Sequence, residues 1–170
     1  MQLLSEYKTP AHVVRHCIAV TEVALAVAGA LNEHGYSLDL DLIRSAGLIH
    51  DIARVQEQHW EVGARVAEEL GLQEEADIIR RHMFYAPCRR AADATELDLV
   101  CLGDRLVKED RYVGLESRMQ YILEKARAAG NEGAEAAIRL KTANLQELIE
   151  DIENTIAMPI DALVKEKSTE

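Results

Sequence analysis

The chain has 170 residues, and 30 acidic residues against 19 basic ones give it a formal charge of −11 at pH 7. A chain of this length can form one domain that buries about two thirds of the surface exposed by its unfolded form. The negative field disfavours a nucleic-acid polymer or an anionic membrane as a partner, so we expect neither. A small phosphorylated ligand can still bind where basic side chains or a metal gather.

The composition favours helices and a reducing compartment. Phe and Trp occur once each, so the core consists mainly of Leu, Ile, Val and Ala, which suits helices better than strands. The three cysteines are widely spaced and form no Cys-x-x-Cys pair, which argues against a disulfide framework or a thiolate zinc site. We find no signal peptide and no apolar stretch of the roughly 18 to 20 residues that a membrane span needs. These features predict an all-α cytoplasmic protein.

The first predicted helix begins at Thr9-Pro10, where a hydroxyl can cap and a proline suits the first turn, and it stops at His34-Gly35. Its apolar stripe recurs at steps of three and four residues and comprises Val13, Cys17, Val20, Ala24, Val27 and Leu31. His16 borders this stripe. An imidazole, which is able to bind a metal, is therefore expected beside the apolar face of the first helix.

A second helix is predicted to begin near Asp39 and to carry His50-Asp51 near its C-terminal end. The pair follows the apolar run 46–49, in a place where core packing alone would favour hydrocarbon. An imidazole beside a carboxylate in such a position indicates a functional site.

Two shorter helices are predicted over residues 60–71 and 72–83, followed by an aperiodic loop over residues 84–93. The next helix, from about residue 95 to residue 108, places Asp104 on its apolar face. A buried acid requires a partner, because desolvation of an unpaired charge is costly.

The rest of the chain predicts a helix after Gly114 and a long last helix that Pro159 kinks or ends. The isoleucine stripe of the last helix suits either the core or the seam of a homodimer. We expect one compact helical domain over residues 9–164, with its C-terminal helices in residues 114–164 and a charged tail over residues 165–170.

Three motifs within residues 11–111 occur in a characteristic order. They are His16-Cys17-Ile18-Ala19-Val20, then Leu48-Ile49-His50-Asp51-Ile52-Ala53-Arg54, then Leu102-Gly103-Asp104-Arg105-Leu106-Val107. In this order they resemble the HD superfamily of metal-dependent phosphohydrolases, whose domain is a helical bundle. The resemblance implies that His16, His50, Asp51 and Asp104 coordinate one divalent ion, commonly manganese, iron, nickel, zinc, cobalt or magnesium. Two imidazoles and two carboxylates also suit a borderline divalent metal on chemical grounds.

The resemblance implies hydrolysis of a small phosphate ester, a nucleotide or nucleotide-derived compound, by attack of metal-bound hydroxide on phosphorus. Whether a monoester or a diester is cleaved stays open. Asp51 would orient the hydroxide or take its proton. Arg54 lies where HD proteins often direct a Lys or Arg at the substrate phosphate, and Lys108 and Arg81 are expected to add positive charge.

His59 and His82 have two interpretations. Some branches of the superfamily use further histidines to hold a second metal, which Asp51 would then bridge. The same two histidines can instead donate hydrogen bonds to a phosphate group. The sequence leaves both alternatives open.

Other functions compete with catalysis. The same pocket can serve a non-catalytic regulatory module that binds a nucleotide or phosphate, or the chain can be a degenerate scaffold that only dimerises. Taken singly, His16 or Asp104 is more often a satisfied core residue than a ligand. Taken together, several buried ionisable groups without an ion would each carry a desolvation penalty, which favours the metal site.

Overall fold

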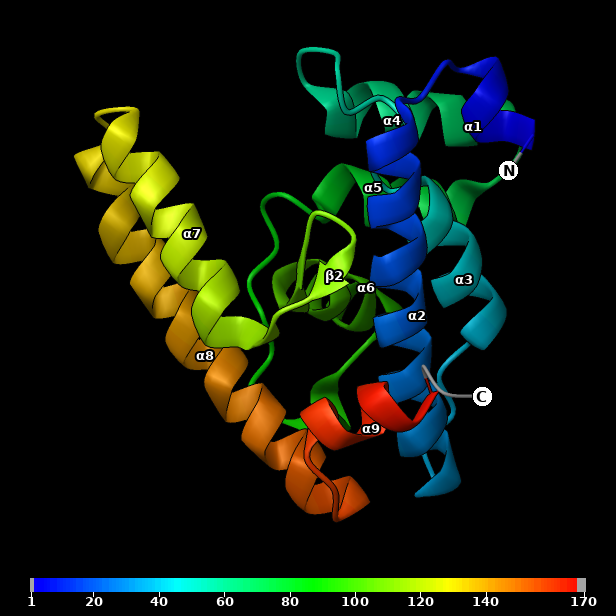
Figure 1. Ribbon diagram of the computed structural model, residues 1–170. Coiled ribbons are helices and arrows are strands. Elements are labelled where there is room, and N and C mark those ends of the chain that lie inside the picture. The colour runs from blue at the N-terminus through cyan, green and yellow to red at the C-terminus, as the bar shows by residue number, and fades with distance from the viewer. Residues whose placement is uncertain (1, 168–170) are drawn as a thin grey trace.

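The computed structural model describes residues 2–167 and is almost entirely helical (Figure 1). Its α-helices are α1 (Gln2–Glu6), α2 (Ala11–Glu33), α3 (Leu40–Ile49), α4 (His59–Glu69), α5 (Gln73–Arg81), α6 (Glu96–Leu106), α7 (Gly114–Ala128), α8 (Glu132–Ile156) and α9 (Ile160–Lys167). A 3₁₀ turn, η1 (Ala91–Asp93), precedes α6, and two strands, β1 (Val107–Lys108) and β2 (Arg111–Tyr112), form a short antiparallel hairpin that pairs Val107 with Tyr112. The all-α prediction is confirmed.

Helix α2 lies at the centre of the fold and packs against α3, α6 and α9 (Figure 1). The six residues of its predicted apolar stripe are all buried. By length and composition alone α2 could cross a membrane, which corrects the expectation that the chain contains no such stretch. Its stripe is covered by neighbouring helices, as in the core helix of a globular domain.

Two glycines allow α3 and α6 to approach α2 closely. A Cβ on Gly103 of α6 would lie 2.6 Å from the backbone oxygen of Val20, and a Cβ on Gly47 of α3 would lie 2.6 Å from Oγ1 of Thr21. Neither contact is sterically allowed, so only glycine permits these helix crossings. Gly103 precedes Asp104, and its close approach therefore brings this carboxylate to the side of α2.

The predicted cap of α3 is found in the structure, but the predicted cap of α2 is not. Oδ1 of Asp39 accepts hydrogen bonds from the N–H groups of Asp41 and Leu42, as expected of a cap at the start of α3. Thr9 does not cap α2, because Pro10 takes the cap position in an extended conformation. The Thr9 hydroxyl instead donates to the carbonyl of Ile52 at 2.9 Å and ties the start of α2 to the turn after Asp51.

One predicted boundary near the C-terminal part of the chain needed correction, and another agrees with the prediction. The helix expected over residues 95–108 ends at Leu106, because the chain turns into the β1–β2 hairpin. The long last helix, α8, ends at Ile156 and α9 begins after Pro159, in agreement with the prediction that Pro159 kinks or ends this helix. The apolar stripe of α8 is buried in the main core through Leu145, Leu148 and Ile152.

Helices α4 and α5 pack against each other and enclose a second, smaller apolar cluster with the end of α3. Helices α7 and α8 form an antiparallel pair on the other side of the molecule, drawn in yellow and orange in Figure 1. Helix α6 and the hairpin lie between these two parts. The face of α7 that looks back toward α2 becomes one wall of the site described next.

Candidate metal centre

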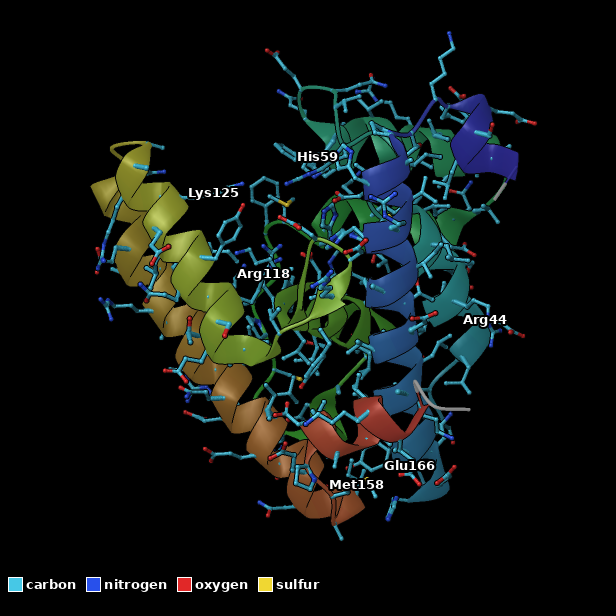
Figure 2. All side chains as sticks on the ribbon, viewed as in Figure 1. Arg44, His59, Arg118, Lys125, Met158 and Glu166 are labelled. Atoms are coloured by element: carbon cyan, nitrogen blue, oxygen red, sulfur yellow. The ribbon has the colours of Figure 1, made fainter. Side chains whose placement is uncertain are left out.

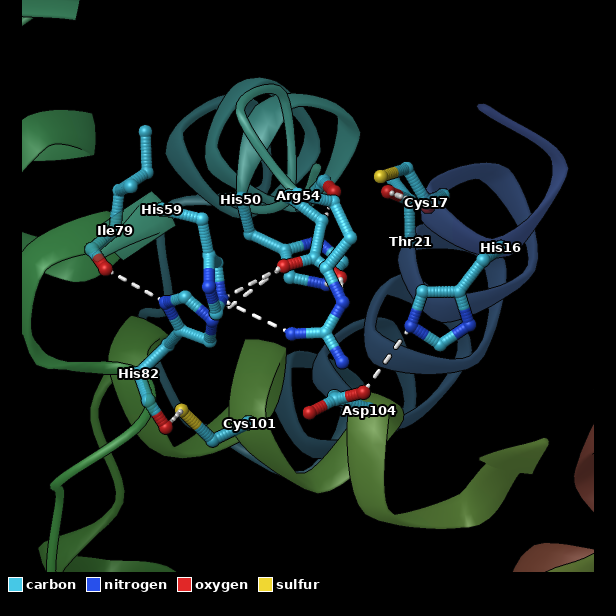
Figure 3. Close-up of polar contacts among 12 residues, drawn as sticks. His16, Cys17, Thr21, His50, Arg54, His59, Ile79, His82, Cys101 and Asp104 are labelled. Atoms are coloured by element: carbon cyan, nitrogen blue, oxygen red, sulfur yellow. Dashed lines mark hydrogen bonds and ion pairs between the residues drawn. The ribbon is translucent and has the colours of Figure 1, made fainter. Parts of the chain in front are cut away.

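The four motif residues come together from three segments of the chain. His16 lies on α2, His50 and Asp51 follow directly after the last residue of α3, and Asp104 lies on α6. Figure 3 labels His16, His50 and Asp104. The Nε2 atom of His16 is 3.2 Å from Oδ1 of Asp104, and the rings of His16 and His50 have centroids 5.5 Å apart. His16, His50 and Asp51 each offer a ligand atom within 4.8 Å of the others. Asp104 is not part of this group of three, and it adjoins the centre through its contact with His16.

Backbone carbonyls fix the tautomers of three histidines. The Nδ1 atoms of His16, His50 and His82 lie 2.6, 2.8 and 2.6 Å from the carbonyl oxygens of Glu109, Gly47 and Ile79. A carbonyl only accepts hydrogen bonds, so each Nδ1–H donates, and Nε2 of the neutral ring carries a lone pair. Metal-ligating histidines are characteristically held in this way, with the second nitrogen anchored to an acceptor.

Two buried atoms at the centre lack hydrogen-bond partners. They are Nε2 of His50 and Oδ1 of Asp51. Leaving a buried nitrogen lone pair and a carboxylate oxygen unsatisfied is costly in free energy. A cation between them would satisfy both, and imidazole nitrogens with carboxylate oxygens are suitable donors for a first-row divalent metal. The residues present therefore fit the divalent ion that the sequence motifs imply.

A second group of possible ligands shares Asp51 with the first. It consists of Asp51, His59 and His82, again with all ligand atoms within 4.8 Å of one another. The Nε2 atoms of His59 and His82 lie 3.3 and 3.7 Å from Oδ1 of Asp51. Nη1 of Arg54 donates to Nε2 of His59 at 3.1 Å, so this nitrogen already has a partner. A second ion at this group requires Arg54 to release His59.

Charge balance keeps the two central acids ionised. Burial raises the pKa of Asp51, but the surrounding His50, His59, His82 and Arg54 outweigh burial and hold it well below its ordinary value. Burial also raises the pKa of Asp104, and there Arg105 and His16 reverse the effect. The pKa of His16 is correspondingly raised, because Asp104 outweighs the effect of burial.

The centre opens into a cleft of about 700 Å³ between α2 and α7. Its lining contains four acidic residues and six basic residues, the latter being Arg15, Arg54, Arg105, Lys108, Arg118 and Lys125. In a chain with a net charge of −11, this is a local reversal of sign. The cleft therefore provides the cations that an anionic ligand requires.

The predicted substrate-binding residues fall into two groups. Arg54, Lys108 and His82 line the cleft, and His59 lies beside Arg54 at the centre. Arg81 is not among the lining residues, because its guanidinium pairs with Asp77 at 2.8 Å on the exposed side of α5. The side chain of His82 points toward the centre, and the side chain of the preceding residue, Arg81, points away from the centre. The expectation for Arg81 is therefore corrected.

Several site residues were not predicted from the sequence. Arg105 is buried and pairs with the neighbouring Asp104, and Arg118 reaches Asp104 from α7 with Nη2 3.6 Å from Oδ1. The spacing of Arg118, Tyr121 and Lys125 does place them on one helical face, but only the tertiary fold shows that this face covers the centre. The carbonyl that orients His16 belongs to Glu109, which has a left-handed backbone conformation (φ 57°). Glutamate rarely adopts this conformation, so it could not be predicted from the residue type.

The fold and the site together define a class: a helical protein with a buried histidine and aspartate centre suited to a divalent metal. The sequence pattern of the HD domain matches residues 13–109, and the chain belongs to this family. An uncharacterized protein of Methanocaldococcus jannaschii is 42% identical over 76 residues, which is 42% of this chain and 45% of that protein. The match thus spans less than half of the relative's length. No solved structure matches the chain.

Proposed function

We propose that this protein is a metal-dependent phosphohydrolase that cleaves a small phosphate ester of the nucleotide type. HD domains are in general phosphohydrolases that bind divalent metals. The observation that supports the proposal most is the pair of unsatisfied buried atoms, Nε2 of His50 and Oδ1 of Asp51, at the base of a cleft rich in cations. A cleft of about 700 Å³ falls within the range of small-molecule sites.

His16, His50 and Asp51 would hold the ion, with Asp104 beside His16 as a fourth ligand. When bound, a divalent ion polarises a phosphoryl oxygen and lowers the pKa of a coordinated water. The remaining contributions come from the chain itself. Arg105 and Arg118 fix the Asp104 carboxylate from two sides, and the backbone carbonyls behind His16 and His50 prevent these rings from turning.

Arg54 is placed to bind the phosphate group that reacts. Its Nε lies 3.5 Å from Oδ2 of Asp51, its side chain is 48% exposed, and it lines the cleft. A guanidinium can hold two phosphate oxygens at once and offset the charge that builds on them during cleavage. Asp51 stays ionised at neutral pH because of its low pKa, so its carboxylate orients the attacking water rather than serving as an acid.

The test is hydrolysis by the full chain loaded in turn with Mn²⁺, Co²⁺, Ni²⁺, Zn²⁺ and Mg²⁺. The panel comprises p-nitrophenyl phosphate, bis-p-nitrophenyl phosphate and nucleoside mono-, di- and triphosphates, with phosphate or nitrophenol release as the readout. We expect metal-dependent turnover that Asp51→Asn lowers by at least about 100-fold, since one central ligand is lost.

The matched control is Asp77→Asn, which makes the same chemical change at an exposed acid outside the cleft lining. It should retain the native rate within about twofold, in keeping with a surface substitution. No hydrolysis of any compound by any metal form, or full activity in Asp51→Asn, would contradict the proposal. Binding of a nucleotide without turnover would favour the regulatory module instead.

A further inference from the structure

The wall of the cleft opposite His16 is formed by α7, which lies outside the segment matched by the HD domain pattern. Arg118, Tyr121 and Lys125 line this wall. Figure 2 shows Arg118 and Lys125 extending from α7 toward the interior of the molecule, on the side where His59 lies. Lys108, at the end of β1, completes the group. We call these four residues the α7 cluster.

Three cations of the α7 cluster surround one aromatic ring. The Nζ atoms of Lys108 and Lys125 lie 4.2 and 4.8 Å from the ring centroid of Tyr121, and the Arg118 guanidinium carbon lies 5.8 Å from it. Cation–π contacts of this kind hold the charged groups in place without neutralising them. The cluster is therefore a fixed concentration of positive charge.

Two acids that line the cleft near the α7 cluster already have arginine partners. Asp110 pairs with Arg15 at 2.9 Å, and Asp104 pairs with Arg105. Among residues 2–167, neither Lys108 nor Lys125 has a carboxylate oxygen within 4 Å of its ammonium group. Two lysines that share one ring without a counter-charge repel each other, and a bound anion would relieve that repulsion.

The α7 cluster is continuous with the metal centre. Arg118 contacts both, because Nη2 lies 3.6 Å from Oδ1 of Asp104 while its guanidinium faces Tyr121. All four cluster residues line the same cleft as His16, Asp51 and Arg54. One elongated ligand can therefore reach both places at once.

We propose that the α7 cluster is a second phosphate subsite and that the ligand is an organic polyphosphate. One phosphate group lies at the metal centre beside Arg54, and a further phosphate of the same molecule accepts hydrogen bonds from Lys108 and Lys125. Charge-assisted bonds from two lysines to a phosphate give a strong preference for ligands that carry the second group. The inference rests on the proposed function for the reacting phosphate, but the subsite itself concerns binding alone.

The test is equilibrium binding to the full metal-loaded chain, measured by calorimetry. The probes are a methylene-bridged nucleoside triphosphate, which resists cleavage, and the corresponding nucleoside monophosphate. We expect the native chain to bind the triphosphate at least about tenfold more tightly, and the double variant Lys108→Gln/Lys125→Gln to lower this ratio by about tenfold or more. Thermal unfolding of the variant confirms that it is folded.

The matched control is Arg127→Gln, which removes a positive charge from the same helix at a residue paired with Glu135 and outside the cleft lining. It should leave the ratio of the two affinities unchanged within about twofold, because Arg127 is exposed, already pairs with Glu135 and does not line the cleft. Equal affinities for the two probes in the native chain overturn the subsite. An equal loss of both affinities in the double variant also overturns it, since that result reflects general attraction. If no compound is hydrolysed but the ratio behaves as expected, the subsite stands and the hydrolytic function fails.

Discussion

Gly103→Ala tests whether the close crossing of α2 and α6 builds the metal centre. The added Cβ would lie 2.6 Å from the backbone oxygen of Val20 and 3.3 Å from its Cγ1. A backbone oxygen in the middle of α2 cannot rotate aside as a side chain would, so α6 must move outward. Asp104 follows Gly103 directly and would move away from His16. In the native protein Oδ1 of Asp104 lies 3.2 Å from Nε2 of His16.

The expected destabilisation follows from two opposing effects. Overpacking of a well-packed interface costs about 3 kcal/mol at its upper end, and alanine regains about 1 kcal/mol of helix propensity over glycine. The net loss is about 2 kcal/mol, which corresponds to a fall in Tm of about 4–8 °C for a domain of this size. Displacement of Asp104 should in addition weaken metal binding by about tenfold or more.

Thermal unfolding followed by circular dichroism measures the first effect, and competition with a fluorescent zinc chelator measures the second. The control is Gly29→Ala, because a Cβ on this α2 residue would meet no heavy atom within 4 Å. That variant should be more stable by about 0.5–1 kcal/mol and should bind metal normally. A Gly103→Ala protein with native stability and native metal affinity would refute the role given to this crossing.

Three further predictions concern the centre. Without metal, protonated His16 contributes stability that is fully present below pH 6.5 and is lost as the pH rises through the raised pKa of His16 in the folded state. With Mn²⁺ bound, stability should instead rise over the same pH interval, because protons compete with the ion for the histidine. Thermal unfolding at several pH values, with and without Mn²⁺, shows whether the two trends are opposite. His82→Ala should leave in place the ion held by His16, His50 and Asp51, as measured by a calorimetric zinc titration, and loss of that ion would contradict the separation of the two ligand groups. Arg54→Lys should lower kcat/KM by about 10- to 100-fold, because lysine cannot hold two phosphate oxygens at once as the guanidinium does. Arg81→Gln should change kcat/KM by less than about twofold, because Arg81 pairs with Asp77 outside the cleft. Equal effects of the two substitutions would show that the cleft is wrongly assigned.

The sequence predicted the elements whose signals are local. The apolar stripe of α2 repeats at the helical period, and Asp39 caps α3 through its own side chain, so neither depends on distant residues. His16 and Asp104 were recognisable because each interrupts an otherwise apolar face. The hairpin at residues 107–112 was missed, since its turn residues, Glu109 and Asp110, lack the glycine that usually marks a two-residue turn.

The rest of the site depends on which helix faces meet. Arg81 and His82 are neighbours in the sequence, and only the packing of α5 determines that the histidine points inward. The α7 cluster likewise has a regular spacing that fits a solvated face as well as a binding wall. Thr9 could serve as a cap by residue type, yet its hydroxyl is used by the distant carbonyl of Ile52. Such choices are made by tertiary contacts rather than by local propensity.

The most direct test of the account is the metal content of the full chain after saturation with Mn²⁺ or Zn²⁺ and extensive dialysis, measured by inductively coupled plasma mass spectrometry. We expect at least one ion per chain in the native protein and a loss of the ion bound with highest affinity in His50→Ala, because the unsatisfied Nε2 of His50 lies at the centre. A native chain that retains no divalent ion, or a His50→Ala variant that retains as much as the native chain, would contradict the central claim.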